Sequence, residues 1–341
     1  PTAVLTPQEI TEFINIMKNL RNEGKSIILI THKLNEIKQS ADRVTVIRHG
    51  KSIGTVDVEG ATDESLAEMM VGRHVNFNLP KKEAKVGKTV LSVKDLKVNE
   101  DRGTLAVKGL TFDVHAGEIL GLAGIDGNGQ DELVEALTGL RHVKAGHFTI
   151  KGTDMTNKRP RKITELGVSH VPADRQKFGL ILEMSLADNI ALQTYYQKPY
   201  SNHGIINHKA ITEHAKKLIK KFDVRTKDEN LKAGELSGGN QQKAIIAREL
   251  DRNSDLIIVF QPTRGLDVGA IEYIHKQLLA QRDAGKAVLL ISYELDEIMQ
   301  LSDRIIVLHN GQESGEVLPE KTSERELGLL MTGAHKKEGT N

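Results

Sequence analysis

An internal repeat is the feature that most constrains how this chain can fold. Residues separated by 261 positions (262 − 1) match from Pro1 to Gly72 without a gap, and self-similarity at a fixed spacing marks duplicated structural units. The matched pairs include Pro1 and Pro262, Thr2 and Thr263, Leu5 and Leu266, Ile10 and Ile271, Arg21 and Arg282, Leu34 and Leu295, Glu36 and Glu297, Asp42 and Asp303, Gly50 and Gly311, Met70 and Met331, and Gly72 and Gly333. Residues 1–72 and 262–333 are therefore expected to share one succession of helices and strands.

The positions of the two copies predict the domain organisation. The second copy belongs to a unit that begins near Val90, about 172 residues before Pro262 (262 − 90). Pro1 is the equivalent of Pro262, so we expect the sequence to start inside a first domain whose earlier part lies upstream. The expected division is a first-domain fragment at 1–75, a linker at 76–89, a second domain at 90–335 and a polar tail at 336–341.

Hydrophobic periodicity and turn residues predict alternating strands and helices. Thr6 is a suitable N-cap before Pro7, and the helix that they begin is expected to run to Asn22. The run at 26–30 predicts a strand buried on both faces of a parallel sheet. Further strands are expected at 43–47, 118–122, 256–260, 287–292 and 304–308, further helices at 34–39, 131–140 and 268–283, and short antiparallel strands at 90–93 and 105–114. With a polar, helix-rich middle over 153–232, the pattern is typical of an α/β fold.

A glycine-rich loop joins the strand expected at 118–122 to the helix expected at 131–140. Its spacing is that of the G-x-x-x-x-G-K-[ST] motif, in which backbone N–H groups cradle phosphates. The candidate phosphate-binding residues are Gly124, Gly127, Asn128, Gly129, Gln130 and Asp131. Gln130 stands where Lys would contact the phosphates, and Asp131 stands where Ser or Thr would bind Mg²⁺. Two like charges about 4 Å apart cost roughly 4 kcal/mol at an effective dielectric near 20, so Asp131 opposes a bound phosphate.

The sequence LSGGNQQK at 236–243 opens another helix. Ser237, Gly238 and Gly239 come before an apolar-periodic run, and a helix N-terminus favours anions such as phosphate. LSGGNQQK resembles the signature motif of ATP-binding cassette (ABC) ATPases, and its GNQQK ending resembles the branch that imports simple sugars and nucleosides. The resemblance implies a P-loop NTPase ABC fold, with a mixed or parallel core sheet, an antiparallel β subdomain and a helical subdomain.

Within this resemblance, the second domain departs from the family pattern at four further positions. Phe260 and Gln261 replace the Asp-Glu pair that ends the Walker B strand, and Ala173 stands at the Q-loop glutamine. Tyr293 stands at the switch histidine, because it is the repeat equivalent of His32 (32 + 261 = 293). The second site is therefore expected not to hydrolyse ATP. Weakened ATP binding, a nucleotide-free site and a plain tight turn remain open interpretations of its glycine loop.

The residues that fit the family pattern serve the first domain. His32 resembles a true switch histidine, which orients the attacking water. In the family, the signature of one domain closes over ATP held by the other, so the resemblance implies that this part of the chain binds that ATP in trans. The residues implied are Ser237, Gly238, Gly239 and Gln241, with Asp267 of the D-loop facing the partner domain.

The resemblance implies the ATP-binding subunit of an ABC importer for nucleosides or simple sugars, peripheral to the cytoplasmic face of the cell membrane. It is a transport ATPase in the full complex, and the isolated fragment is expected to be inactive. The implied cofactors are ATP and Mg²⁺, with Mg²⁺ mainly at the site of the first domain. The implied partners are the first ABC domain, membrane permease subunits and an extracellular solute-binding protein. The segment 175–189 resembles the part that receives the coupling helix of the permease.

Two other functional classes are weighed against this one: a soluble ABC protein acting on ribosomes or DNA, and a regulatory module that senses ATP. The chain has 47 Lys and Arg against 46 Asp and Glu, a net charge of +1, so no nucleic-acid partner is expected. It contains no Cys, which excludes disulfides and Cys-ligated metals, and its 13 His do not cluster at ligand spacing. No apolar run reaches the length of a membrane span.

Overall fold

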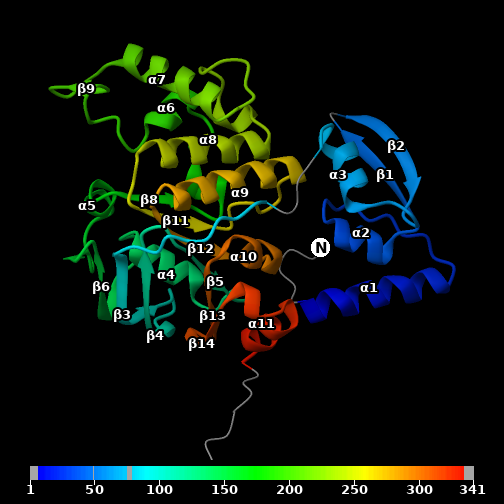
Figure 1. The fold of residues 1–341 in the computed structure, drawn as a ribbon. Coiled ribbons are helices and arrows are strands. Elements are labelled where there is room, and N and C mark those ends of the chain that lie inside the picture. Colours follow the sequence, from blue (N-terminus) through cyan, green and yellow to red (C-terminus); the bar gives the residue numbers. More distant parts are fainter. Residues whose placement is uncertain (1–6, 49, 75–78, 334–341) are drawn as a thin grey trace, which may run out of the picture.

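The centre of the fold is a mixed sheet with the strand order β14-β13-β5-β12-β11-β8. The computed structural model describes residues 7–48, 50–74 and 79–333, and this sheet lies in the last range (Figure 1). Its strands are β5 (Ile119–Ala123), β8 (Val168–Val171), β11 (Leu256–Phe260), β12 (Ala287–Ser292), β13 (Arg304–His309) and β14 (Gln312–Val317). All neighbours pair in parallel except β13 and β14, which are antiparallel. The predicted core sheet is confirmed.

The three central strands are apolar along their whole length because both of their faces are covered. Every residue of β5, β11 and β12 is buried, as expected for parallel strands enclosed by helices or by a second sheet. Their carboxyl ends therefore emerge from a rigid core, and the loops that follow them carry the candidate site.

A second sheet, with the order β4-β3-β6-β7, is antiparallel throughout. Its strands are β3 (Thr89–Asn99), β4 (Leu105–His115), β6 (Val143–Ile150) and β7 (Thr153–Asp154). The inner face of this sheet shares one apolar cluster with α4 (Gln130–Leu137) and with one face of the central sheet. This arrangement confirms the predicted antiparallel β subdomain and fixes the glycine loop between the two sheets.

A helical region follows in the chain, and its helix α8 (Gly238–Asp251) packs on the other face of the central sheet. Its elements are α5 (Pro160–Glu165), the π-helical turn η1 (Arg175–Gly179), α6 (Leu186–Ala191), the hairpin strands β9 (Ser201–Asn202) and β10 (Ile205–Ile206), α7 (His208–Lys221), η2 (Ala233–Glu235) and α8 (Gly238–Asp251). Figure 1 shows α6 and α7 stacked on α8 at one end of the molecule. They share an apolar cluster with the central strands, so α8 links the helical region to the sheet.

The internal repeat is reproduced in the structure. The first copy contains α1 (Pro7–Asn22), α2 (Leu34–Ser40), β1 (Arg43–Arg48), β2 (Lys51–Asp57) and α3 (Asp63–Val71). The second copy contains α9 (Val268–Asp283), α10 (Leu295–Leu301), β13, β14 and, after the turn η3 (Pro319–Lys321), α11 (Glu324–Met331). Shifting the first copy by 261 residues superposes the bounds of α1, α2 and β1 on those of α9, α10 and β13.

One predicted strand is wrong. Residues 26–30 form no strand, and the side chains of Ile28 and Ile30 are 92 % and 89 % exposed. Their repeat equivalents in β12, Leu289 and Ile291, are fully buried between two neighbouring strands. The physical reason is that a parallel strand needs hydrogen-bonding neighbours, and the described part of the first copy supplies none to this segment.

Smaller differences concern helix ends. The helix expected at 131–140 ends at Leu137, because Gly139 adopts a left-handed conformation (φ +79°) and closes it. The helices α3 and α11 were not predicted, although each begins with a capping box, Thr62 with Ser65 and Ser323 with Glu326. Thr6, the boundary at 75–78 and the tail at 336–341 lie outside the described residues.

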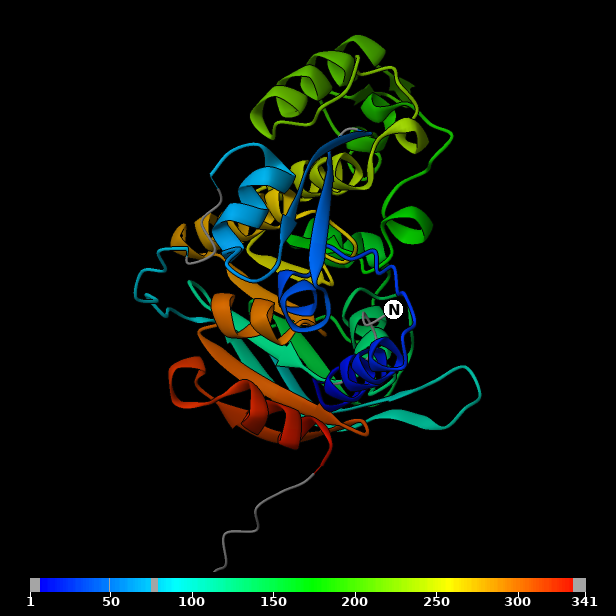
Figure 2. The same cartoon turned by 90° about the vertical axis from the view of Figure 1, so that its right-hand side faces the viewer.

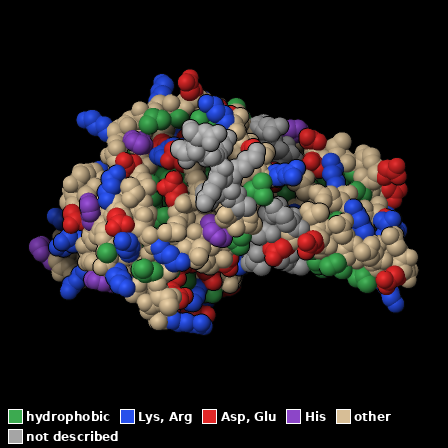
Figure 3. All heavy atoms as spheres, turned by 90° about the horizontal axis from the view of Figure 1, so that it is seen from below, with side chains coloured by type: hydrophobic (Ala, Val, Ile, Leu, Met, Phe, Trp, Pro, Cys, Tyr) green, Lys and Arg blue, Asp and Glu red, His purple; other side chains and the backbone are tan. Residues whose placement is uncertain are grey.

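The surface carries charges of both signs. The face shown in Figure 3 has Lys and Arg interspersed with Asp and Glu rather than gathered by sign. Over residues 7–48, 50–74 and 79–333, no helix is long and apolar enough to cross a membrane. The same residues contain no group of three or more His, Asp or Glu side chains arranged to hold a metal ion.

Candidate functional site

The glycine loop runs from the end of β5 into α4, as the sequence predicted. Gly127 and Gly129 have φ values of +82° and +98°, and a Cβ at Gly129 would lie only 2.6 Å from the carbonyl oxygen of Ala106, so both positions favour glycine. Asn128 accepts a hydrogen bond from the backbone N–H of Asn310 at 2.9 Å. The β13–β14 turn therefore holds the loop in place.

Gln130 fills the inside of this loop. Its side chain is only 1 % exposed, and its Nε2 donates a hydrogen bond to the carbonyl oxygen of Ile125 at 3.2 Å. Its Oε1 is buried and has no hydrogen-bond partner among the described residues. The amide thus lies inside the loop, where it cannot supply the positive charge that a lysine would bring to a phosphate.

Asp131, in the first turn of α4, belongs to an acidic group at the edge of the loop. Burial, with smaller contributions from the charges of Glu132 and Asp126, raises the pKa of Asp131 to about 6. The carboxyl is therefore mostly ionised near neutral pH, and it becomes protonated as the pH falls through about 6. An anion approaching the loop meets this negative charge.

Three of the replaced positions lie together beside the loop. Phe260 and Tyr293 pack edge to face, with ring centroids 6.0 Å apart, and Ala173 and Tyr293 both pack against the apolar cluster that contains Phe260. The Tyr293 hydroxyl donates a hydrogen bond to Asp126 Oδ1 at 3.1 Å. Burial and the charges of Asp131 and Asp126 raise the pKa of Tyr293, so it stays a neutral donor.

Gln261, at the end of β11, adopts a left-handed backbone conformation with φ +51°, which is uncommon for a residue other than glycine. Its backbone N–H donates to the carbonyl oxygen of Ile291 at 2.8 Å. Its side chain is 4 % exposed, and Nε2 has no partner among the described residues. Gln130 and Gln261 thus both keep a buried, unpaired amide atom at this site, and one water or ligand atom could satisfy each.

The signature residues form the N-terminus of α8. Ser237 is the N-cap and makes no capping hydrogen bond with its side chain; instead its hydroxyl accepts a hydrogen bond from Asn240 Nδ2 at 2.9 Å. A Cβ at Gly238 would lie 2.8 Å from Nη2 of Arg175, so a guanidinium group lies directly beside the helix end. Helix N-terminus and arginine together form a site suited to an anion.

Sequence reasoning missed the proximity of Arg175 to the signature, because the two are far apart in the chain and no local pattern joins them. Its Nη1 donates to the carbonyl oxygen of Arg264 at 2.9 Å. Gln241 lies on the inner side of α8, 1 % exposed, with its amide bonded to Ala233 and Gln176. Its expected contact with nucleotide stays a prediction.

Asp267 and His32 lie near the boundary between the two repeat copies. Asp267 is the N-cap of α9 and accepts a hydrogen bond from the N–H of Ala270 at 2.9 Å. His32 is partly buried, and the next residue, Lys33, forms an ion pair with Glu294 of the second copy, Nζ to Oε2, at 2.7 Å. The structure thus brings the switch segment of the first copy beside that of the second.

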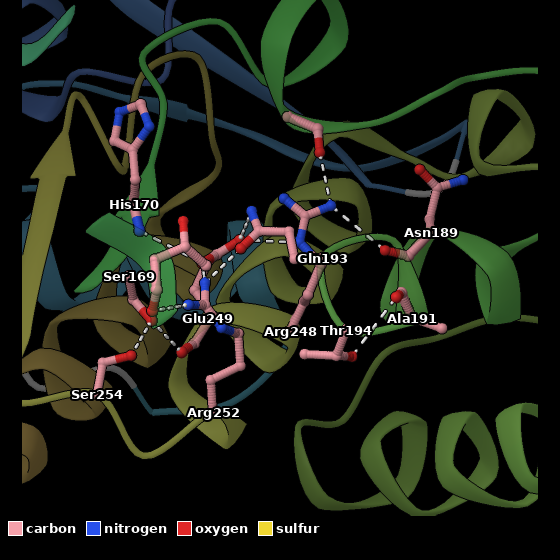
Figure 4. A network of polar contacts seen from close by, with 12 residues as sticks. Ser169, His170, Asn189, Ala191, Gln193, Thr194, Arg248, Glu249, Arg252 and Ser254 are labelled. Atoms are coloured by element: carbon pink, nitrogen blue, oxygen red, sulfur yellow. Dashed lines mark hydrogen bonds and ion pairs between the residues drawn. The ribbon is translucent and has the colours of Figure 1, made fainter. Parts of the chain in front are cut away.

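The far end of α8 is fixed by a buried polar network (Figure 4). Glu249 is fully buried and accepts hydrogen bonds from Arg248 at 2.8 Å, Gln193 at 2.9 Å and Arg252 at 3.0 Å. Burial lowers the pKa of the neighbouring His170 to about 4, so that ring is neutral. Gln193, Arg248 and Arg252 also line a cleft of about 340 Å³, together with Thr164, Glu165, Gly167, Ile190, Thr194, Gln197, Lys198, Pro199, Tyr200, His214, Asp251 and Ser254.

This combination defines a class of protein. A glycine loop between a buried strand and a helix, an added antiparallel sheet and a helical region that carries the LSGG motif are the parts of an ABC ATPase domain. Residues 107–264 match the family described as ABC transporter. The chain therefore belongs to the ABC transporter family of ATP-binding proteins.

Particular relatives extend this match along the chain. It is 62 % identical over 335 residues to the nucleoside import ATP-binding protein NupA of Lactococcus lactis, covering 98 % of this chain and 66 % of that protein. It is 56 % identical over 338 residues to the guanosine import ATP-binding protein NupO of Bacillus subtilis, covering 99 % of this chain and again 66 % of the relative. The chain thus spans just under two thirds of the length of both curated relatives.

A solved structure shares the fold. A nucleotide-free ATP-binding cassette from an ABC transporter superposes with a TM-score of 0.60 at 24 % identity, covering 71 % of this chain and 95 % of that one. At this identity, the likeness establishes the fold and leaves the chemistry to the residues of this chain.

ABC ATPase domains bind ATP with Mg²⁺, and the residues of the second site fit this cofactor only in part. The backbone of the loop has the form of a phosphate cradle, and Asp131 offers a carboxylate to a cation. Phe260 and Gln261, however, offer neither the carboxylate that holds a metal nor a base for water. The loop thus suits a phosphate, whereas the end of β11 offers no carboxylate to a cation.

Proposed function

We propose that this chain is part of the ATP-binding subunit of an importer for nucleosides, with simple sugars as the alternative cargo, at the cytoplasmic face of the cell membrane. The observation that carries the proposal is the 62 % and 56 % identity, along almost the whole chain, to proteins named for nucleoside and guanosine import. Membrane permease subunits and an extracellular solute-binding protein are its partners.

The competent ATP site in this proposal is composite. A first ABC domain of the same protein holds ATP and Mg²⁺, His32 orients the attacking water, and the signature residues Ser237, Gly238 and Gly239 close over the phosphates from the second domain. The exposed Ile28 and Ile30 support the presence of further first-domain strands, because an apolar segment whose repeat equivalent is buried is suited to a sheet interior. Asp267 faces the same interface.

The second site binds ATP weakly and does not hydrolyse it. Four residues oppose ATP binding or hydrolysis at this site. Gln130 occupies the loop and Asp131 repels phosphate, whereas Phe260 and Gln261 lack the carboxylates that hold the metal and activate water. We expect the purified chain to show measurable ATP binding and no Mg²⁺-dependent turnover by calorimetry and phosphate release. Hydrolysis well above background would contradict the proposal.

A double variant of the glycine loop tests whether weak ATP binding and the absence of hydrolysis have separate causes. Gln130→Lys combined with Asp131→Thr restores a positive charge and a hydroxyl at the loop, and is expected to tighten ATP binding by roughly tenfold or more, since a charge-assisted contact is gained and a repulsion is removed. Turnover should stay absent, because Phe260 and Gln261 are unchanged. Turnover by this variant would show that the loop alone limits the reaction.

Asp131 should make ATP binding to the second site depend on pH. Its pKa is raised to about 6, so the carboxyl is neutral below that pH and charged above it. ATP affinity should therefore rise as the pH falls through 6, and Asp131→Asn should bind more tightly than wild type at pH 7.5, by roughly fivefold. Calorimetry at several pH values, with exposed Asp228→Asn as the control, measures the difference. Parallel pH profiles for all three proteins would contradict this role of Asp131.

We place the permease contact at the helical region. The segment 175–189 exposes the apolar side chains of Phe178 (63 %), Ile181 (44 %) and Met184 (37 %), and it leads into α6 beside the 340 Å³ cleft. Exposed apolar side chains on one short segment suit contact with a docked helix from a membrane subunit. Arg248 and Glu249 connect this cleft to α8 and hence to the signature at its other end.

The cargo is tested in the complete transporter. Proteoliposomes that contain the full-length subunit, its permease and its solute-binding protein should accumulate labelled guanosine in an ATP-dependent manner, and labelled ribose should not enter at a comparable rate. Uptake of the sugar without the nucleoside would overturn the nucleoside assignment. Association of the purified chain with ribosomes or DNA instead of the permease would overturn the importer assignment.

A further inference from the structure

The two repeat copies contact each other through equivalent surfaces. Helix α3 of the first copy packs against α9 of the second, and α1 of the first copy packs against α11 of the second (Figures 1 and 2). Because α9 is the equivalent of α1, and α11 is the equivalent of α3, these are the two halves of one isologous contact, as in a two-fold dimer. The chain thus carries a pseudo-two-fold interface between its own copies.

The first of these contacts is close and apolar. Val268, at the start of α9, belongs to the same apolar cluster as Leu66 and Ala67 of α3. A Cβ at Gly269 would lie 2.8 Å from Cγ1 of Val71, so glycine at this position lets α9 approach α3. Arg73, just after α3, adds an ion pair to the buried Glu272 of α9, Nη1 to Oε2, at 2.6 Å.

One ion pair lies on the pseudo-two-fold axis itself. Lys33 and Glu294 are repeat equivalents, 261 residues apart, and Nζ of Lys33 lies 2.7 Å from Oε2 of Glu294. Only a residue near the axis can meet its own equivalent. In a pairing of two identical copies, this position would bring Lys against Lys or Glu against Glu, which is repulsive. The tandem chain has opposite charges at the two equivalent positions.

The same pair joins the two switch segments. Lys33 follows His32, and Glu294 follows Tyr293. Each segment is also held by an equivalent turn: the Thr31 hydroxyl accepts from the N–H of Lys33 at 3.1 Å, and the Ser292 hydroxyl accepts from the N–H of Glu294 at 3.1 Å. The ion pair therefore connects two turns that are each fixed by a local hydrogen bond.

We infer that Lys33 and Glu294 are positioning residues: their charge pair selects the pairing of the two unlike copies and fixes their switch segments against each other on the pseudo-two-fold axis. Opposite charges at one self-facing position favour the unlike pair and disfavour both like pairs, which is how charge gives specificity at an interface. The partner of each copy is thus the unlike copy, which in this structure belongs to the same chain.

Charge reversal and charge exchange test this inference on the full 341-residue chain, which contains no native Cys. Spin labels at Glu59→Cys and Glu320→Cys report the distance between the copies by pulsed electron resonance. Lys33→Glu and Glu294→Lys should each lower the ratio of docked to undocked copies by roughly tenfold. The exchange variant, Lys33→Glu with Glu294→Lys, should restore the wild-type distance distribution. Lys51→Glu, an exposed charge reversal on β2, is the control.

Folding of each variant is monitored by its thermal transition, so that loss of docking is read only from folded protein. A purely structural role at either residue would not be repaired by exchange. Unchanged distances in both single variants, or an exchange variant that remains undocked, would overturn the inference.

Discussion

Replacement of Arg282 by alanine is expected to lower the free energy of unfolding by about 3 kcal/mol, because a fully buried guanidinium loses its ion pairs with Asp303 and Asp283, although Asp303 keeps a second partner in Lys81. The Arg282 side chain is 1 % exposed, and its Nη1 lies 2.8 Å from Oδ1 of Asp303. Its Nη2 donates to the carbonyl oxygen of Lys82 and to Asp283. Asp303 in turn accepts from the N–H of Ile119 at the start of β5, so the loss reaches the central sheet. Urea denaturation measures the change.

The repeat supplies a matched control for this prediction. Arg21 and Asp42 are the equivalents of Arg282 and Asp303, and they form the same ion pair at 2.7 Å, but their side chains are 52 % and 67 % exposed. An exposed pair contributes about 0–1 kcal/mol, so Arg21→Ala should cost no more than that. Equal losses from the two variants would show that burial does not set the strength of this pair.

Replacement of His32 by alanine is expected to reduce ATP hydrolysis by the complete two-copy protein on the order of 100-fold or more. The prediction follows from the proposed composite site, in which the imidazole contacts the terminal phosphate and positions water, and removal of one such preorganised group has an effect of this size. Phosphate release by the full-length subunit assembled with its permease measures it. ATP binding should change far less than turnover.

The equivalent residue of the second copy again serves as the control. Tyr293→Phe removes the hydroxyl that binds Asp126 and retains the ring that packs against Phe260. Because we propose that the second site does not hydrolyse ATP, turnover should stay within about twofold of wild type. Equal losses from His32→Ala and Tyr293→Phe would contradict the asymmetry of the two sites.

Much of the fold could be predicted because its signals are local. The apolar runs of β11 and β12 and the Pro7 start of α1 are marked by neighbouring residues alone, and the repeat relates the bounds of α1 to those of α9. The glycine loop and the signature could be found in the same way, since their spacing is fixed by backbone geometry. The capping boxes of α3 and α11 are local signals of the same kind.

The strand predicted at 26–30 is absent because strand formation depends on non-local contacts. The apolar pattern of this segment matches that of β12, but a central parallel strand is formed by its neighbours as much as by its own residues. Ile28 and Ile30 are therefore exposed, although their pattern predicts burial. The packing of Arg175 against Gly238 was also beyond prediction, because it depends on how η1 meets the start of α8.

The sequence by itself determined the duplicated architecture and the positions of the glycine loop and the LSGG helix start, and it supports our proposal that the second site lacks the side chains for hydrolysis. Each of these depends on residue identity and spacing, which local sterics and chemistry convert directly into structure. Only the tertiary structure decided that Gln130 folds into its own loop, that Phe260 and Tyr293 pack beside it, and that Lys33 meets Glu294. These contacts join residues from separate elements, so packing, rather than any local pattern, sets them.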